Sequence, residues 1–216
     1  ENNISEGMQR GDKMRPAAPI TFHGFKLSGH SHRAELMLRF LDLPYRFQEV
    51  DIFNGAQRSD AFGALNVFRT VPVIEDGATV IADSVAILVY LASRYDAPRR
   101  WLPADPIGQA QVQRWLSVAQ NQIAHGPARA RVIRRFKGPY DLGQAQAIAS
   151  RLFPVVDAEL ARRDFIAGAA PTIADVALYS YTAVAPEGGI DLGPYRAIND
   201  WLKRIEALPR FEGMPQ

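Results

Sequence analysis

Three short segments of the sequence carry residue types that could bind a charged small molecule. In the first, Val71 precedes Pro72 where a strand is expected to begin, and a proline there has no amide hydrogen for the strand ladder. The Val71 backbone is therefore free to pair with a group from outside the sheet. Cis peptide bonds occur almost only before proline, so the bond between these two residues could be cis.

The second segment is the pair Asp83-Ser84, which stands just before an apolar series with helical spacing. Amide groups at the start of a helix attract a carboxylate, and the Asp83 side chain could accept a hydrogen bond from an ammonium group. A zwitterionic amino acid would satisfy both groups. An edge proline and an ordinary helix cap would explain either of these two segments taken alone.

The third segment is Ser-Gly-His-Ser-His-Arg, which begins at Ser28 between an expected strand and an expected helix. A hydroxyl there could donate to a thiolate, and the helix amides behind it would add partial positive charge. Lowering a thiol pKa from about 8.5 by roughly two units requires about 2.7 kcal/mol of preferential stabilisation. The sulfur would belong to a substrate, because the chain of 216 residues contains no cysteine. Ser28 or Ser31 could instead only cap the helix.

The elements that position these residues follow from the apolar periodicity. A β-branched run at 71–74, the turn dipeptide Asp76-Gly77 and a second run at 80–81 predict a hairpin, and a helix should begin at Asp83 or Ser84. Upstream, residues 20–25 and 45–52 predict two strands joined by a helix. Strand, helix, strand implies a right-handed crossover and a parallel pair, so the sequence predicts a small mixed sheet of the thioredoxin-like kind.

Beyond this α/β part the character of the sequence changes to helix. Prolines and the run Arg-Arg-Trp mark residues 96–106 as a linker. Helices are expected at 109–123, at 144–160 with an interruption at Pro154, and at 198–208, with a bend at 125–129. Thr172 and Asp175 predict a capping box at the start of another helix. The expected division is a mobile tail over 1–18, a thioredoxin-like domain over 19–95, the linker over 96–106 and an all-helical domain over 107–216.

The motifs together resemble the glutathione transferase family from Ile20 to Phe211. The resemblance lies in Val-Pro-Val-Ile-Glu-Asp-Gly, in Asp-Ser-Val-Ala-Ile, and in the serine loop, which is similar to that of the theta and zeta-like classes and related bacterial groups. It implies that Ser28 activates the thiol, since no tyrosine stands at the end of the first strand. It also implies glutathione contacts from Gln57, Val71, Pro72, Asp83 and Ser84.

Further expectations concern the second substrate and the partners. Trp115, His125 and Arg129 are candidates for the electrophile pocket, and family members are usually homodimers. The charged groups, 25 basic and 23 acidic, give a net charge of only +2, which does not imply nucleic acid. No apolar run approaches the roughly 20 residues that span a bilayer, and no secretory leader is evident, so a cytoplasmic protein is expected. His30 and His32 have no third ligand nearby, so no metal is expected.

The resemblance implies conjugation of the glutathione thiolate to an electrophilic small molecule. A glutathione-dependent peroxidase or dehalogenase that uses the same site remains an alternative. A non-catalytic glutathione-binding or regulatory protein of the same fold is another, because fold alone does not fix function.

Overall fold

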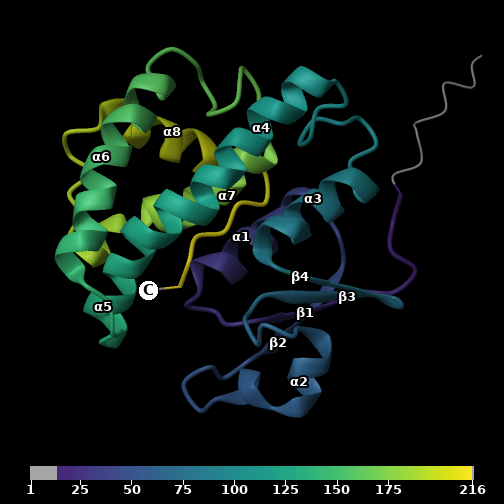
Figure 1. Cartoon of the computed structure of the whole chain (residues 1–216). Coiled ribbons are helices and arrows are strands. Elements are labelled where there is room, and N and C mark those ends of the chain that lie inside the picture. The colour runs from purple at the N-terminus through teal and green to yellow at the C-terminus, as the bar shows by residue number, and fades with distance from the viewer. Residues whose placement is uncertain (1–13, 216) are drawn as a thin grey trace, which may run out of the picture.

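The computed structural model of the chain describes residues 14–215, so most of the expected tail lies outside the described residues. The described chain forms two parts (Figure 1). A small sheet with flanking helices is built from the first part of the chain, and a bundle of helices is built from the rest. This is the predicted fold class, with a thioredoxin-like α/β part followed by an all-helical part.

The sheet has four strands in the order β2-β1-β3-β4, with bounds β1 Ile20–Gly24, β2 Tyr45–Glu49, β3 Val73–Asp76 and β4 Thr79–Ala82. β1 pairs parallel with β2 and antiparallel with β3, and β3 pairs antiparallel with β4. The predicted parallel crossover and the predicted hairpin are both confirmed. Gly77 takes φ of +60° in the hairpin turn, a conformation that glycine adopts without steric cost.

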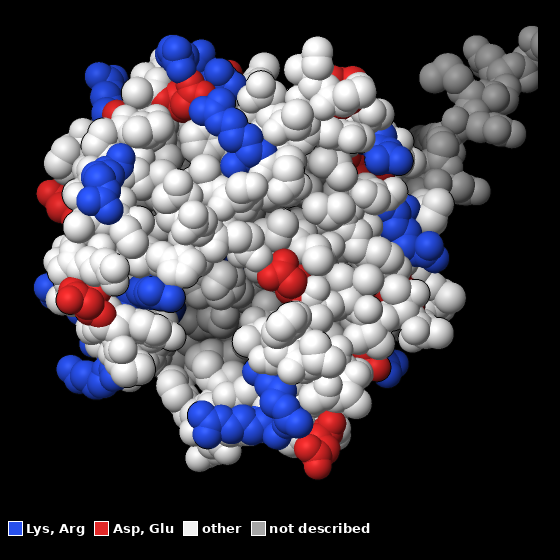
Figure 2. Space-filling view, viewed as in Figure 1, with Lys and Arg blue, Asp and Glu red and all other residues white. Residues whose placement is uncertain are grey.

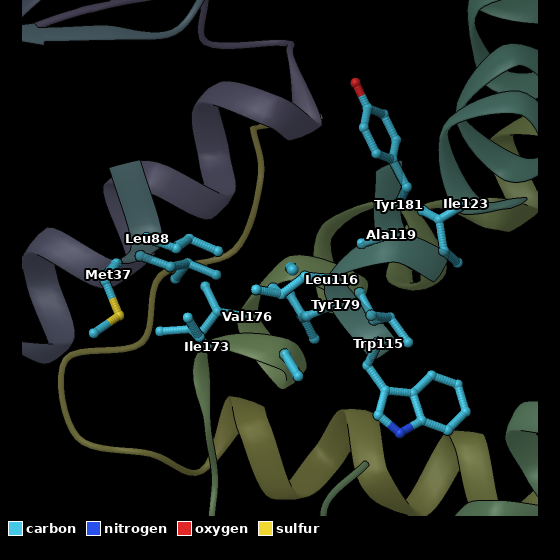
Figure 3. Packing of buried hydrophobic residues seen from close by; sticks show 14 of the residues in the cluster. Met37, Leu88, Trp115, Leu116, Ala119, Ile123, Ile173, Val176, Tyr179 and Tyr181 are labelled. Carbon is cyan, nitrogen blue, oxygen red and sulfur yellow. The ribbon is translucent and has the colours of Figure 1, made fainter. Parts of the chain in front are cut away.

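The helices of the first part are α1 Gly29–Phe40, α2 Asp60–Leu65 and α3 Ser84–Tyr95, with a short 3₁₀ turn η1 at Ala56–Arg58. α1 and α3 lie between the sheet and the helical bundle (Figure 1). Figure 3 shows Met37 of α1 and Leu88 of α3 beside Ile173 and Val176 of the bundle. These side chains belong to one continuous apolar core that joins the two parts, so burial fixes both helices against the bundle.

The bundle contains α4 Pro106–Val118, the π-helix η2 Ala119–Ala128, α5 Arg129–Phe136, α6 Leu142–Leu160, α7 Ile173–Ala183, the 3₁₀ turn η3 Ala185–Gly188 and α8 Arg196–Glu206. The helix α7 is buried along nearly its whole length and forms the centre of the bundle. None of the described helices combines the length and the apolar character needed to cross a membrane.

Two predictions about prolines were wrong. The helical run is not interrupted at residues 125–129, because α4 continues through the π-helix into α5 with Pro127 inside it. Gly126 makes this path possible, since a Cβ there would lie 3.1 Å from the Ile148 side chain of α6. Likewise α6 is not interrupted at Pro154. The buried residues around it, including Phe153, are held by the core, so tertiary packing outweighs the local cost of a proline.

The predicted capping box at the start of α7 is confirmed. Thr172 Oγ1 accepts a 3.2 Å hydrogen bond from the Ala174 amide, and the Asp175 carboxylate accepts from the Thr172 amide at 2.8 Å. The same carboxylate accepts from the Ile166 amide at 2.8 Å and from the Trp201 indole at 2.9 Å. Asp175 therefore ties the start of α7 to α8 and to the loop before it.

Candidate functional site

Ser28 is the N-cap of α1. Its Oγ accepts a 3.3 Å hydrogen bond from the Ser31 amide, so the capping role foreseen for it is real. A cap uses an oxygen lone pair, and its hydroxyl proton remains available for donation. Within residues 14–215 no group accepts that proton. The other serine of the loop is buried, and its Oγ accepts from the Phe25 amide at 3.0 Å, so Ser31 has a structural role.

The second candidate segment also begins a helix, as predicted. Asp83 is the N-cap of α3, and its Oδ1 accepts hydrogen bonds from the Val85 amide at 2.8 Å and from the Ala86 amide at 3.0 Å. The other carboxylate oxygen, Oδ2, accepts a 2.7 Å hydrogen bond from Gln120 of the π-helix. Asp83 has φ of +76°, an uncommon backbone conformation for a residue with a side chain. Its carboxylate is thus held in place by both parts of the chain.

His30 joins these two helix starts. Its Nδ1 lies 3.4 Å from the Ser84 hydroxyl, and its ring makes an edge contact with Tyr181 of α7 at 5.0 Å between centroids. Burial, with a smaller contribution from the Arg33 charge, lowers the pKa of His30 to about 3. The imidazole is therefore neutral at neutral pH and adds no charge to the site.

The Tyr181 ring packs against Gly29 and His30 at the start of α1, and the Arg33 guanidinium lies beside the same ring. A Cβ at Gly29 would lie 2.7 Å from the Tyr181 ring, so only glycine fits between Ser28 and the tyrosine. The Arg33 guanidinium is fully buried, lies 5.8 Å from the centroid of the same ring, and has no hydrogen-bond partner among the described residues. Burial lowers the pKa of Arg33 to about 10. The N-terminal turn of α1 therefore contains a buried positive charge.

The remaining predicted glutathione contacts lie on the adjoining loops. The peptide bond between Val71 and Pro72 is cis, and Val71 is half-buried just before β3. Gln57, in η1, donates through Nε2 to the Ile52 carbonyl at 3.3 Å, while its Oε1 is buried without a partner among the described residues. Its amide is thus turned toward its own loop.

The three residues predicted for the second-substrate pocket all lie along the helical run of α4, η2 and α5. Trp115 is buried and lines a cavity of about 410 Å³ between α4 and α6, and its indole points in the opposite direction from Tyr181 (Figure 3). His125 is held by its Nδ1 at 2.8 Å from the Asn121 carbonyl. The Arg129 guanidinium lies 4.7 Å from the centroid of the Tyr140 ring.

Sequence reasoning missed the residue of the bundle that reaches the serine turn. Arg131 of α5 donates from Nη1 to the Leu27 carbonyl at 2.7 Å, and from Nε to Glu187 at 2.8 Å. The sequence has four arginines within residues 129–135, and their spacing alone does not show which of them faces the turn. Gln120 gave no signal at all, because the π-helix that places it was not foreseen.

Aromatic side chains extend the site toward the end of α5. The ring centroid of Phe53, from the loop after β2, lies 5.2 Å from that of Phe25 and 5.5 Å from that of Phe136. Phe25 precedes the serine turn by only a few residues, so this group bridges the two parts of the chain beside Ser28. Figure 2 shows the surface hollowed between the two parts on the face drawn there.

The chain is similar to known proteins in sequence and in structure. A family model described as the glutathione S-transferase N-terminal domain matches residues 27–94, and one described as the C-terminal domain matches residues 128–209. Glutathione S-transferase theta-2 of Rattus norvegicus is 29% identical over 192 residues, which cover 84% of this chain and 78% of that relative. Maleylpyruvate isomerase of a Ralstonia species is 29% identical over 204 residues, which cover 90% and 95% of the two chains.

Solved structures give the same result. A glutathione S-transferase from Pseudomonas fluorescens superposes with a TM-score of 0.86 at 33% identity, covering 92% of this chain and all of that one. A glutathione transferase homologue from a Drosophila species, solved with bound glutathione, superposes with a TM-score of 0.78 at 28% identity, covering 88% and 89%.

Proposed function

Because the chain belongs to the glutathione S-transferase family, we propose that Ser28 ionises bound glutathione and that the thiolate then attacks an electrophilic small molecule. The observation that supports this most is the contact between His30 and Ser84, which brings the serine turn and the start of α3 to one place. A tripeptide can therefore present its sulfur to one helix start and its γ-glutamyl end to the other.

The chemistry requires little of the protein beyond stabilising the thiolate and holding it near its target. The Ser28 hydroxyl donates to the sulfur, and the amides of the first turn of α1 add partial positive charge. The thiol proton leaves to solvent. The thiolate forms a carbon–sulfur bond, and the electrophile either loses its leaving group or takes up a proton after addition.

The γ-glutamyl end is assigned to α3. The Asp83 carboxylate, already oriented by Gln120, attracts the ammonium group, and the Ser84 amide and hydroxyl take the carboxylate. The Val71 backbone pairs with the cysteinyl residue beside Pro72. Gln57 holds the glycyl carboxylate after its amide turns away from the Ile52 carbonyl.

The electrophile is assigned to the space between the serine turn and α5. Phe53 with Phe136 supplies an aromatic surface, and the buried Tyr181 ring supports the serine turn from the other side. These residues replace Trp115 in the proposal, since that indole faces the interior of the bundle. His125 and Arg129 remain proposed only as outer residues that attract an anionic co-substrate.

Neighbouring reactions use the same first step. Peroxidase or dehalogenase chemistry would also begin with the thiolate, and the Ralstonia relative is named as an isomerase of maleylpyruvate, an unsaturated anion. A screen should therefore include a haloaromatic compound, a haloalkane, an organic hydroperoxide and maleylpyruvate, each with glutathione. Glutathione binding without turnover of any of them would favour a regulatory role.

We also propose a cytoplasmic homodimer, and the division into a tail over 1–18, a domain over 19–95, a linker over 96–106 and a helical domain over 107–216. Sedimentation of the purified protein tests the dimer directly. A mass equal to that of the 23.9 kDa chain at micromolar concentration would contradict it.

Calorimetric titration with glutathione tests the assignment of the site. Asp83→Asn keeps an oxygen for the cap but removes the charge, so it should weaken binding by about tenfold while the protein stays folded. Asp83→Ala should weaken binding as well and also destabilise α3. Ser28→Ala should leave the affinity nearly intact and lower turnover. Equal losses of affinity in the Ser28 and Asp83 variants would contradict this division of roles.

A further inference from the structure

We infer that Arg131 is a positioning residue for thiol activation, acting from the helical part of the chain on the turn that carries Ser28. The inference rests on the proposed function of Ser28. It assigns to Arg131 both the placement of that turn and a share of the positive charge that the thiolate requires.

The Arg131 side chain joins α5 to the turn before Ser28. It is only 1% exposed and lies across the boundary between the two parts of the chain. Nη1 donates to the Leu27 carbonyl at 2.7 Å, and Leu27 is covalently joined to Ser28. Nη2 belongs to the same rigid guanidinium, is buried, and has no partner among the described residues. Positive charge with an unused donor therefore lies beside the peptide that leads into Ser28.

A carboxylate of the η3 turn holds the Arg131 guanidinium in place. Glu187 accepts from Arg131 Nε at 2.8 Å and from Arg135 Nη1 at 3.0 Å, so one carboxylate serves two guanidinium groups. Gly188 allows the η3 turn to approach α5, because a Cβ there would lie 2.9 Å from the Arg131 amide nitrogen. The cluster of these three charged side chains has a net positive charge. A buried charge is stronger electrostatically than an exposed one, so this cluster favours an anion at the serine turn.

The turn that carries Ser28 also has hydrogen bonds of its own. Ser28 donates its amide hydrogen to the Phe25 carbonyl at 2.9 Å, and Ser28 Oγ accepts from the Ser31 amide at 3.3 Å. These are local bonds within the first part of the chain, whereas the Arg131 bond joins the Leu27 carbonyl of the turn to the bundle. Without this bond, the Leu27 carbonyl loses a charged donor. The Ser28 hydroxyl is then held less firmly relative to the proposed electrophile space between the turn and α5.

Arg135 provides a matched control. It binds the same carboxylate oxygen as Arg131, and its guanidinium lies at 5.7 Å from the Phe136 centroid, against 5.5 Å for Arg131. It makes no contact with the serine turn among the described residues. Arg135→Met therefore removes an arginine from the same ion cluster without touching Leu27.

The test is the pKa of enzyme-bound glutathione, followed by thiolate absorbance, together with the dissociation constant and kcat. In Arg131→Met the bound thiol pKa should rise by about one unit, from about 6.5 to about 7.5, so the thiolate fraction at pH 7 and kcat should fall about threefold. Glutathione affinity should change less than about threefold. Arg135→Met should shift the thiol pKa much less than Arg131→Met does, because the Arg135 side chain is 30% exposed to solvent and makes no bond to Leu27. In a Ser28→Ala background, Arg131→Met should have a smaller effect, because only its contribution of charge remains once the Ser28 hydroxyl is gone.

An unchanged thiol pKa in a folded Arg131→Met variant would overturn the inference, and so would an equal shift in Arg135→Met. If Arg131→Met does not fold, Arg131→Lys is used, which keeps the charge but cannot reach Leu27 and Glu187 together. A raised pKa in this variant supports the inference, and the wild-type value overturns it. If the wild type does not bind glutathione, the proposed function is overturned together with the inference. If the wild type lowers the thiol pKa and the Arg131 variants lower it equally, only the inference is overturned.

Discussion

The side-chain amide of Gln120 donates a 2.7 Å hydrogen bond to the carboxylate of Asp83. The two residues lie 37 positions apart, one in the π-helix of the bundle and one at the start of α3. The bond orients the carboxylate oxygen that the α3 amides leave free. The helical part thus helps to build the γ-glutamyl site proposed above.

Replacing Gln120 by alanine should therefore weaken glutathione binding. Loss of one hydrogen bond to a charged group is worth about 1.5 kcal/mol, or roughly tenfold in the dissociation constant. Calorimetric titration measures it. The control is Gln122→Ala, two residues further along the same helix and exposed. Affinity equal to or tighter than that of the wild type would show that Gln120 does not support the site.

Gly29 and Tyr181 give a steric prediction. Gly29→Ala places a methyl group 2.7 Å from the tyrosine ring, which should cost about 1–3 kcal/mol of stability and shift the Ser28 cap. Turnover should fall with it. The double variant Gly29→Ala/Tyr181→Leu should recover part of the lost stability, because leucine vacates the space that the new methyl group needs. Urea unfolding of the three variants measures this, and additive losses would contradict the steric explanation.

The capping box of α7 should be a structural feature without a direct role in binding. Thr172→Ala removes one cap bond and should cost about 1 kcal/mol. Asp175→Ala leaves two buried amides and the Trp201 indole without an acceptor, so its cost should reach about 3 kcal/mol or more. Urea unfolding gives both values. Thr172→Ala should bind glutathione as the wild type does, and a clear loss of affinity would contradict a purely structural role.

The buried His32 should make the free energy of unfolding depend on pH. Its Nδ1 lies 2.9 Å from Ser180 Oγ and its Nε2 lies 2.8 Å from the Glu212 carbonyl, and burial lowers its pKa from 6.5 to about 4. The unfolded chain therefore binds a proton that the folded chain does not, and stability should fall as the pH drops through this window. His32→Gln should reduce the slope of unfolding free energy by up to about 1.4 kcal/mol per pH unit. An identical slope in both proteins would contradict this explanation.

The fold could be predicted where local signals agree with the core. The hairpin, the crossover and the starts of α3 and α7 each depend on residues within a few positions, such as Asp76-Gly77 and Asp83. The uninterrupted helix through Pro127 could not be predicted, because it depends on close packing of Gly126 against α6, which is distant in the sequence. The same is true of the site. Ser28 and Asp83 are marked by their own helix starts, whereas the choice of Arg131 over Arg129 depends on the phase of α5.

The most direct test of the account is the pKa of the glutathione thiol bound to the wild type and to Ser28→Ala, followed by thiolate absorbance against pH. We expect a bound thiol pKa about two units below its ordinary value of about 8.5 in the wild type, and a return of at least one unit toward that value in the variant. Glutathione affinity should be nearly the same in both. The same lowered pKa in both proteins would contradict the central claim that the Ser28 hydroxyl stabilises the thiolate.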